Sequence, residues 1–382
     1  MHLTTLKLQN FRNHLSSSFA FSERSNVLLG DNGHGKTNII EAIAYLCLTR
    51  SFYAGSDALV LNLQSDTFEV EGSFHSDRGM GYHVRLAYSR NELLKVYTVN
   101  RRHIEPFSSV IGKFPVVICS PEHAPITIGG PPERRKFVDF IISQSNISYY
   151  QDLLEYRRVL KQRNKILLDA RLSKRDAHDL LDPWDEQLVE FGSRLMVKRI
   201  QFVHEFQEFL RKSYQQVVEI GEDPTLEYKP TYLTMPTLDE NRVQELLALE
   251  VSKKRYEEQR IGTSLVGPHR DEFVMKINGL DLRKFASQGQ HKTFLVALKL
   301  GEFSYLKARC GETPILLLDD IFSELDEHRA ERLLNLVEGL SQTFITSINT
   351  HLFDASMVFG DHNRKFSIQH GSVIEQRTMA TA

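Results

Sequence analysis

The residues with the clearest capacity for chemistry in this sequence form a glycine-rich segment with the spacing GxxxxGK[ST]. Glycines at these positions let the backbone curl until its N–H groups point at a phosphate. The lysine of this pattern reaches the β- and γ-phosphates of a nucleotide, and the hydroxyl after it ligates Mg²⁺. The pattern predicts a site for ATP and Mg²⁺ made of Gly30, Asp31, Asn32, Gly33, His34, Gly35, Lys36 and Thr37.

The flanking sequence contains the elements that such a loop requires. The apolar run at 26–29 predicts a short strand before the loop, and apolar residues at helical spacing over 36–48 predict a helix after it. A helix that starts here also directs the positive end of its dipole at the phosphate. This order of strand, loop and helix favours a phosphate site over a chance glycine-rich turn.

A second candidate site is a pair of carboxylates, Asp319 and Asp320, at the end of the apolar run 315–319. Ligands bind beyond the carboxyl ends of strands in open parallel sheets. We expect Asp319 to be the Mg²⁺ partner and Asp320 to position or polarise an attacking water. The alternative is a strand that ends in a solvated turn, and the phosphate loop elsewhere in the chain disfavours it.

Ser287, Gly289 and Gln290 precede or open a predicted helix that ends at 309. Serine and glycine are common at helix N-caps, which is one interpretation. In the other, the Ser287 hydroxyl and the Gly289 N–H donate to a γ-phosphate. Because the chain already has a phosphate loop, this second site would act across a dimer. Asp326 also has two interpretations, a helix N-cap and a functional residue, and its type does not separate them.

Positive charge gathers in one stretch, although the formal net charge of the chain is -2. Residues 151–175 hold eight Lys or Arg against three Asp or Glu, a local excess of +5. Such a stretch is usually a solvated helix face, but fixed cations also bind the DNA backbone. Arg12 also has two interpretations: a solvated arginine at the strand edge, or a contact to phosphate or DNA. The candidate DNA contacts in the stretch are Arg157, Arg158, Lys161 and Lys165.

The composition is that of an ordinary globular protein, with 41% hydrophobic and 25% charged residues. The 3 cysteines are distant from one another and lack CxxC spacing, so the sequence indicates neither a disulfide framework nor a zinc site. The first residues show no secretion signal, and no apolar run is long enough to span a bilayer. We expect a cytoplasmic location.

The order of predicted elements indicates an α/β fold that is split along the chain. Alternating apolar residues predict strands in the first third, long helical runs follow at 133–168 and 184–217, and the last third returns to strands. Pro183 is expected to break the helical pattern. We therefore expect a mixed sheet-and-helix domain formed from both chain ends, 1–125 and 262–382, with an all-helical arm at 126–261.

These motifs together resemble the ABC-type P-loop ATPase heads of SMC and Rad50 proteins, and more closely the RecF family of bacterial recombination proteins. The resemblance runs from end to end. The helical insertion of about 130 residues is too short for the long coiled coil and hinge of SMC and Rad50 chains. The resemblance is carried by the stretches LQNFRN, GDNGHGKTNIIEAI, SPEHAPITIGGPPERRKFVD, GPHRD, SQGQ and LLLDDIFSELDEHR.

The resemblance implies an ATP-dependent DNA-binding protein of recombinational repair with weak, DNA-stimulated ATP hydrolysis. Two copies would close on two ATP molecules, so that Ser287 and Gly289 of one copy cap the nucleotide held by Lys36 of the other. Asp326 would lie at the same interface, and Arg12 and Gln290 would join the nucleotide site. The expected partners are duplex and gapped DNA, a second copy of the chain, RecR and RecO, with RecA loading as the outcome.

The sequence departs from the family pattern at several positions. His123 stands where an acidic residue is expected, Glu272 replaces a usual aspartate, and Tyr53 stands near a usual arginine, which puts a DNA contact there in doubt. The strand at 343–347 is not followed by the histidine that ABC transporters place near the γ-phosphate. Thr346 or Ser347 is a candidate to stand in for it.

Three other functions compete with a DNA-repair ATPase. A nucleotide-gated DNA clamp that does not hydrolyse ATP is disfavoured by the Asp319–Asp320 pair. The ATPase subunit of a membrane transporter is disfavoured by the long helical insertion with its basic face. An ATPase–nuclease of the overcoming-lysogeny type is disfavoured because no clustered acidic metal site follows the head in the sequence.

Overall fold

The computed structural model describes residues 1–176, 178–218, 221–232, 238–324, 327–348, 353 and 363–379. The chain forms two compact units. Unit 1 comprises Met1–Ala124, Ser213–Glu219 and Leu295–Ala382, and unit 2 comprises Pro125–Lys212 and Ile220–Phe294. Within the described residues, no helix has the length and apolar character needed to cross a membrane.

The compact units and the predicted domains divide the chain at different places. Residues 262–294 were predicted to belong to the ATPase head, whereas they pack in unit 2. The reason is local pairing, because β10 (Glu272–Ile277) is hydrogen-bonded along its length to β9 (Pro224–Lys229). Whether both chain ends work as one head stays a prediction.

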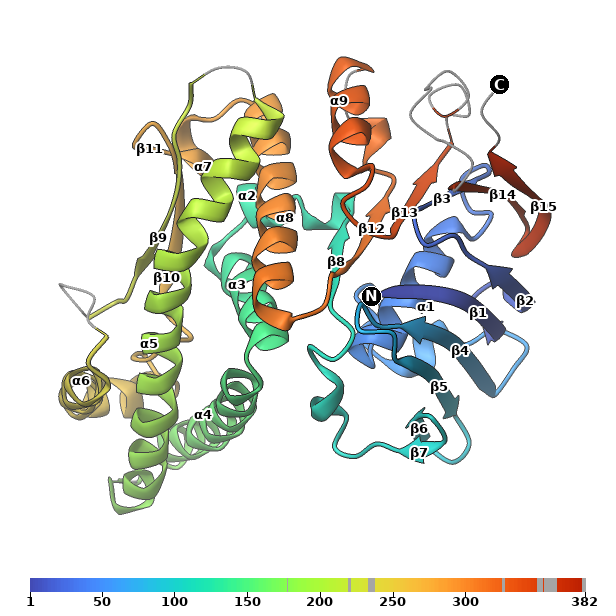
Figure 1. The fold of residues 1–382 in the computed structure, drawn as a ribbon. Helices are drawn as coiled ribbons and strands as arrows, with labels where there is room; N and C mark the ends of the chain where they lie inside the picture. The colour runs from blue at the N-terminus through green and yellow to red at the C-terminus, as the bar shows by residue number, and fades with distance from the viewer. Residues whose placement is uncertain are drawn as a thin grey trace. The chain divides into compact units, whose positions relative to one another are not determined.

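The first sheet of unit 1 is antiparallel and follows the first third of the chain (Figure 1). Its strand order is β2-β1-β4-β5-β6-β7. Burial alternates along β4 and β5, so one face of each strand supplies the core, as their alternating apolar residues predicted. The strands are β1 (His2–Phe11), β2 (His14–Ala20), β4 (Thr67–His75), β5 (Gly81–Ser89), β6 (Leu94–Val99) and β7 (Arg102–His103).

The second sheet of unit 1 combines strands from both ends of the chain, in the order β15-β14-β3-β13-β12-β8. All its neighbours pair in parallel except β14 and β15. Every residue of β3, β12, β13 and β8 is buried, as expected for a parallel sheet covered on both faces. The strands are β3 (Ser25–Leu29), β8 (Val116–Cys119), β12 (Ile315–Asp319), β13 (Thr343–Ser347), β14 (Asn363–Gln369) and β15 (Ser372–Met379).

Helix α1 (Lys36–Leu48) packs between the two sheets of unit 1. Residues from Ile39 to Leu48 are buried without a break, so the helix is buried on all sides rather than along one stripe. Its bounds are those predicted from the sequence. The short helices and turns of unit 1 are Asp57–Val60, Phe107–Val110, Pro121–His123, Phe322–Glu324 and α9 (Glu327–Val337).

Unit 2 is mainly helical and carries a small antiparallel sheet of order β11-β10-β9. The predicted run at 133–168 proves to be two helices separated at Asn146, whose side chain caps the second by accepting from Tyr149 N at 3.0 Å. Helices α5 and α8 each include residues of both units. The elements are α2 (Pro125–Ile128), α3 (Pro131–Ser145), α4 (Ile147–Ser173), α5 (His178–Val217), α6 (Glu240–Ile261), β11 (Leu280–Asp281), α7 (Leu282–Phe285) and α8 (Gln288–Cys310).

The expected helix break at Pro183 is wrong, because Pro183 lies inside α5. It occupies the second turn, near the helix start, where its missing N–H removes a single backbone hydrogen bond. The Gln187 side chain donates to the Pro183 carbonyl at 3.1 Å, one turn later. With 40 residues in all, α5 is long enough to outweigh this local loss.

Buried ion pairs and hydrogen bonds fix the interior of unit 2. Arg163 is fully buried and donates to Asp185 and Glu258, both at 2.6 Å. Asp271, at the end of the Gly-Pro-His-Arg-Asp stretch, is also fully buried and accepts from Thr231 N at 3.0 Å. Glu272, one of the departures from the family pattern, accepts from Arg134 at 2.9 and 3.1 Å.

Candidate phosphate-loop and magnesium site

The glycine-rich segment of unit 1 forms the predicted loop between β3 and α1. Two of its glycines cannot carry a side chain. At Gly35 the backbone has φ +104°, and a Cβ there would lie 2.5 Å from the Asn13 side chain. At Gly30 a Cβ would lie 2.3 Å from the carbonyl oxygen of Ile368. The loop is therefore packed against the Ile368 backbone and the Asn13 side chain at distances that only glycine allows.

Two neighbouring turns hold this loop in place. From the β1–β2 turn, His14 Nε2 donates to the Gly35 carbonyl at 3.0 Å, and Asn13 accepts from Asn38 at 2.7 Å. From the β14–β15 turn, Gly371 N donates to the His34 carbonyl at 2.9 Å. Burial lowers the pKa of His14, which keeps the imidazole neutral inside this contact.

Lys36 is folded into the loop that precedes it. Its Nζ donates to the carbonyl oxygens of Gly30 at 2.6 Å and Asp31 at 2.8 Å. Burial lowers the pKa of Lys36, and the carboxylates of Asp320, Asp319 and Asp31 oppose this effect. The loop therefore contains a partly desolvated ammonium group, which can form charge-assisted hydrogen bonds with phosphate oxygens.

The carboxyl ends of four parallel strands meet beside the loop. Strand register places Leu29 next to Ser347, Thr346 next to Asp319, and Leu318 next to Cys119. Polar residues that follow or end these strands are therefore brought together. Asp319 is among them, at the strand end where it was predicted to meet a ligand.

Thr37 and Asp319 form the centre of the site. The Thr37 hydroxyl donates to Asp319 Oδ1 at 2.9 Å, and Asp319 is 2% exposed. Two cis oxygen ligands of an octahedral Mg²⁺ at about 2.1 Å are separated by about 3 Å. The donor types and their spacing thus fit the ion that the sequence predicted, with Thr37 and Asp319 as the residues to hold it.

Thr346 is a second hydroxyl donor to the Asp319 carboxylate. Its hydroxyl donates to Asp319 Oδ1 at 2.8 Å and accepts from Asp320 N at 2.9 Å. Asp320 has a left-handed backbone, with φ 50°, which turns the chain immediately after the strand. Thr346 is one of the two residues named as candidates to stand in for the transporter histidine, and that role stays a prediction.

Tyr53 also contacts the site, and sequence reasoning noted it only as a departure from the family. Its hydroxyl donates to Asp319 Oδ2 at 2.7 Å. Burial, and then the charge of Asp319, raise the pKa of Tyr53 far above its usual value, so the phenol stays protonated. No spacing pattern links position 53 to position 319, so the contact has no signal in the sequence.

Arg12 anchors the first strand to α1. Its guanidinium donates twice to the buried Glu41, at 2.8 Å each, and to the Leu59 carbonyl at 2.9 Å. The solvated-edge interpretation is therefore wrong, because the side chain is only 27% exposed and its guanidinium is bound to Glu41 and the Leu59 carbonyl. A contact from Arg12 to nucleotide or DNA stays a prediction.

Ser287, Gly289 and Gln290 lie at the start of α8, in unit 2. Gln290 N donates to the Ser287 hydroxyl at 3.2 Å, and Ser287 N donates to the Gln290 side chain at 2.9 Å. This reciprocal pair is a capping box, so Ser287 is the N-cap of α8, and its contact with a γ-phosphate stays a prediction. Ser287 is exposed, and its hydroxyl hydrogen can still be donated outward. Asp326 lies outside the described residues.

The basic stretch lies on α4 and divides into surface and core. Arg157, Lys161 and Lys165 are exposed and follow one another at intervals of four residues, which places them on one helix face. Arg158 is also exposed and pairs with Glu155 at 2.7 Å. Arg163 is a core residue instead, which removes one charge from the predicted excess at the surface.

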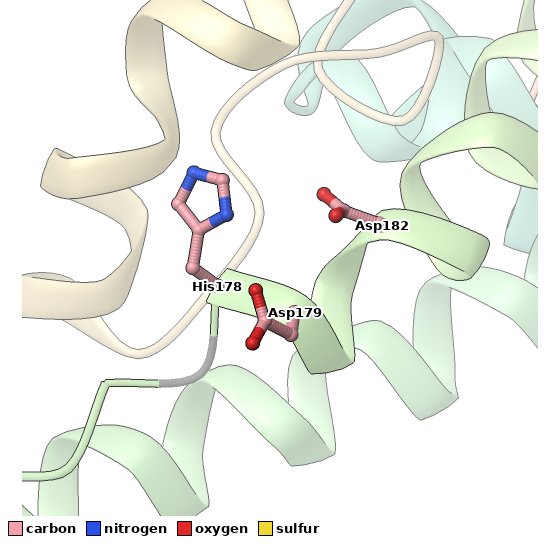
Figure 2. A group of neighbouring side chains, drawn as sticks. All are labelled: His178, Asp179 and Asp182. Carbon is pink, nitrogen blue, oxygen red and sulfur yellow. The ribbon is translucent and has the colours of Figure 1, made fainter.

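A separate group of potential metal ligands lies at the start of α5 in unit 2. Figure 2 shows His178, Asp179 and Asp182 on the first turns of this helix. The Arg255 guanidinium lies 3.0 Å from His178 Nδ1 and 2.8 Å from Asp182, so a cation already contacts two of the three residues. A groove of about 800 Å³ between α5 and α6 lies beside it and shares no residue with the phosphate loop.

Comparison with known proteins agrees with this geometry. The family model "RecF/RecN/SMC N terminal domain" matches residues 2–370. A "DNA replication and repair protein RecF" from Chloroherpeton thalassium is 42% identical, with 91% of this chain and 95% of the relative covered. The relative of the same name from Acetivibrio thermocellus is 35% identical, with 95% and 97% covered.

Solved structures give the same result. A structure of the recombination mediator protein RecF-ATP in the RecFOR pathway has a TM-score of 0.88 at 33% identity, covering 98% of this chain and 97% of the other. An SmcHead bound to the C-winged helix domain of ScpA has a TM-score of 0.57 at 13% identity, covering 100% and 98%, which shows a shared fold. The predicted fold class, an ABC-type ATPase head with a helical arm, is confirmed. The chain belongs to the RecF family of DNA replication and repair proteins.

Proposed function

We propose that this chain is an ATP-dependent DNA-binding protein of recombinational repair, in which ATP joins two copies into the form that grips DNA. The observation that carries the proposal is the contact between Thr37 and Asp319, 2.9 Å apart, at the edge of the parallel sheet. It unites the two motifs on which nucleotide chemistry depends, and the RecF-ATP structure gives a precedent for the ligand.

The nucleotide would lie in the loop from Gly30 to Thr37. Lys36 neutralises phosphate charge, and the N-terminus of α1 adds backbone N–H donors and the positive end of its dipole. Thr37 and Asp319 would hold Mg²⁺, which supplies charge neutralisation at the phosphates when it is bound. Asp320 would orient the attacking water.

The second copy would contribute the start of α8. Ser287 is exposed and its hydroxyl hydrogen is available, while the helix N-terminus offers further N–H donors toward a γ-phosphate. In this proposal Ser287 and Gly289 bind across the dimer, with Asp326 at the same interface and Arg12 and Gln290 near the nucleotide. Hydrolysis would then separate the copies.

DNA binding would use fixed positive charge rather than base reading. The exposed residues of the α4 stripe, Arg157, Lys161 and Lys165, are suited to phosphates, and none is an aromatic that could stack on a base. Gapped DNA, RecR and RecO as partners, and RecA loading as the outcome, are proposed from family membership. The same basis supports the division into a head at 1–125 and 262–382 and an arm at 126–261.

The test is the oligomeric state with and without ATP, measured by sedimentation. The wild-type chain is expected to form a dimer only with Mg²⁺ and ATP, and gapped DNA is expected to bind mainly to that dimer. Lys36→Ala should remain monomeric at every ATP concentration that saturates the wild type. Lys95→Ala, which removes a partly buried lysine of unit 1 away from the loop, is the matched control and should still dimerise. A wild-type chain that ignores ATP would overturn the proposal.

A clamp that binds ATP without hydrolysing it is the remaining rival. Single-turnover hydrolysis by wild type and by Asp320→Asn separates the two functions. The ATPase proposal expects a measurable rate that the variant loses, together with a dimer that the variant retains for longer. Equal rates in both proteins would favour the clamp.

A further inference from the structure

The carboxylate of Asp319 is held on both of its oxygens. Oδ1 accepts from Thr37 at 2.9 Å and from Thr346 at 2.8 Å, while Oδ2 accepts from Tyr53 at 2.7 Å. Within the described residues, the hydrogen bond from Tyr53 is the only one that Oδ2 accepts. Because the two threonines hold one oxygen only, this bond fixes the rotation of the carboxylate about its Cβ–Cγ bond.

The Tyr53 phenol is itself placed by a built turn after α1. Ser51 Oγ accepts from the backbone N–H groups of Tyr53 at 2.9 Å and Ala54 at 2.7 Å. The same hydroxyl donates to Glu41, which Arg12 holds through two hydrogen bonds. Position 53 is therefore tied to the middle of α1 rather than left to a free loop.

The phenol also contacts the next strand end along the sheet. Ser120 follows β8 and lies near enough to the phenol to oppose the rise in the Tyr53 pKa, while its hydroxyl is hydrogen-bonded to His123 Nδ1 at 3.0 Å. Tyr53 thus lies between Ser120 and Asp319, two residues that follow or end adjacent strands. It links three segments that the metal ligands themselves do not join.

We propose that Tyr53 is the positioning residue for Asp319: by holding Oδ2 it keeps Oδ1 directed at Thr37, so that the two magnesium ligands are pre-arranged. This deepens the proposed function and rests on it. Partners that hydrogen-bond metal-ligating carboxylates typically contribute about 10- to 100-fold to metal affinity. Tyr53 would therefore set the Mg²⁺ requirement of nucleotide binding without touching the nucleotide.

The experiment is a Mg²⁺ titration of ATP binding to full-length wild type and Tyr53→Phe, followed by fluorescence of a labelled ATP analogue. The variant keeps the ring and loses only the hydroxyl. We expect its half-saturating Mg²⁺ concentration to rise about tenfold, while analogue binding in EDTA stays unchanged. In an Asp319→Asn background, Tyr53→Phe should cause no further change, because its action runs through that carboxylate.

Tyr97→Phe is the matched control, since Tyr97 is a buried tyrosine of unit 1 whose hydroxyl donates to the Leu46 carbonyl at 2.6 Å, away from Asp319. It should leave the Mg²⁺ requirement at the wild-type value. An unchanged requirement in Tyr53→Phe would show a packing role, and a lower one would show that the phenol competes with the ion; either result overturns the proposal. A wild type that binds no analogue in Mg²⁺ would instead overturn the proposed function.

Discussion

Thr37 and Asp319 are separated by 282 positions in the chain, yet the hydroxyl of one donates to the carboxylate of the other at 2.9 Å. The contact forms because α1 starts directly beyond β3, and β12 lies two strands away in the same parallel sheet. It brings two separate sequence motifs together as one set of oxygen ligands for Mg²⁺.

Removing either of these metal-ligating oxygens should therefore weaken Mg²⁺ binding more than nucleotide binding. Thr37→Val keeps the shape of the side chain and loses the hydroxyl, so the Mg²⁺ concentration needed for ATP binding should rise by at least about tenfold. Binding of ATP in EDTA should change little. A titration of Thr98→Val, on β6 of the other sheet, provides the control. An equal loss of affinity with and without Mg²⁺ would contradict the assignment of Thr37 as a metal ligand.

The role of Ser287 can be separated from its capping role by two substitutions. Ser287→Ala removes the cap and should cost about 1 kcal/mol of folding free energy while leaving some dimer formation. Ser287→Arg adds bulk and charge at an exposed helix start, so it should abolish ATP-dependent dimerisation but leave ATP binding by the monomer close to wild type. The two variants are compared by sedimentation and denaturant unfolding. Normal ATP turnover by Ser287→Arg would rule out action across a dimer.

The α4 stripe predicts a specific salt dependence of DNA binding. Replacing Arg157, Lys161 and Lys165 together by glutamate should weaken binding by at least about tenfold and reduce the slope of log affinity against log salt by about 2 to 3. A matched triple reversal of Arg242, Lys253 and Lys254, exposed on α6, should leave the slope unchanged. If both triples behave alike, the α4 stripe is an ordinary solvated face.

Arg163 should be far more important for stability than its exposed neighbours. Arg163→Ala leaves the buried carboxylates Asp185 and Glu258 without their shared cation, which should lower the free energy of unfolding by about 3 to 5 kcal/mol. Arg158→Ala, which breaks an exposed pair with Glu155, should cost less than about 1 kcal/mol. Denaturant unfolding of both variants measures the difference, and equal losses would contradict the burial of Arg163.

Acid should destabilise unit 2 through His269. Burial lowers the pKa of this imidazole to about 4, so the unfolded chain binds a proton between pH 6.5 and 4 that the folded chain does not. Stability contributed by the neutral ring is present above pH 6.5 and falls as the pH drops through this window. The shift corresponds to about 3 kcal/mol at most. Unfolding of His269→Gln between pH 7 and 4.5 should show a smaller loss than wild type, and an identical slope would contradict this.

Several elements could be predicted because their causes are local. The bounds of α1 follow from apolar residues at helical spacing after a glycine loop, and β12 from an unbroken apolar run that ends in carboxylates. The division of 133–168 at Asn146 was missed, because a capping asparagine between two helices does not interrupt the apolar pattern. Arg163 was counted with the basic stretch at 151–175, because charge alone does not reveal a buried partner.

The sequence by itself determined the phosphate loop, the acidic strand end and the family, since each depends on residue types at fixed spacing within a short segment. Only the tertiary structure decided that Tyr53 and Thr346 hold Asp319, that Arg12 is bound to Glu41, and that Arg163 lies in the core. The reason is physical: hydrogen bonds and ion pairs between distant segments depend on strand register and helix packing, and neither leaves a spacing pattern in the chain.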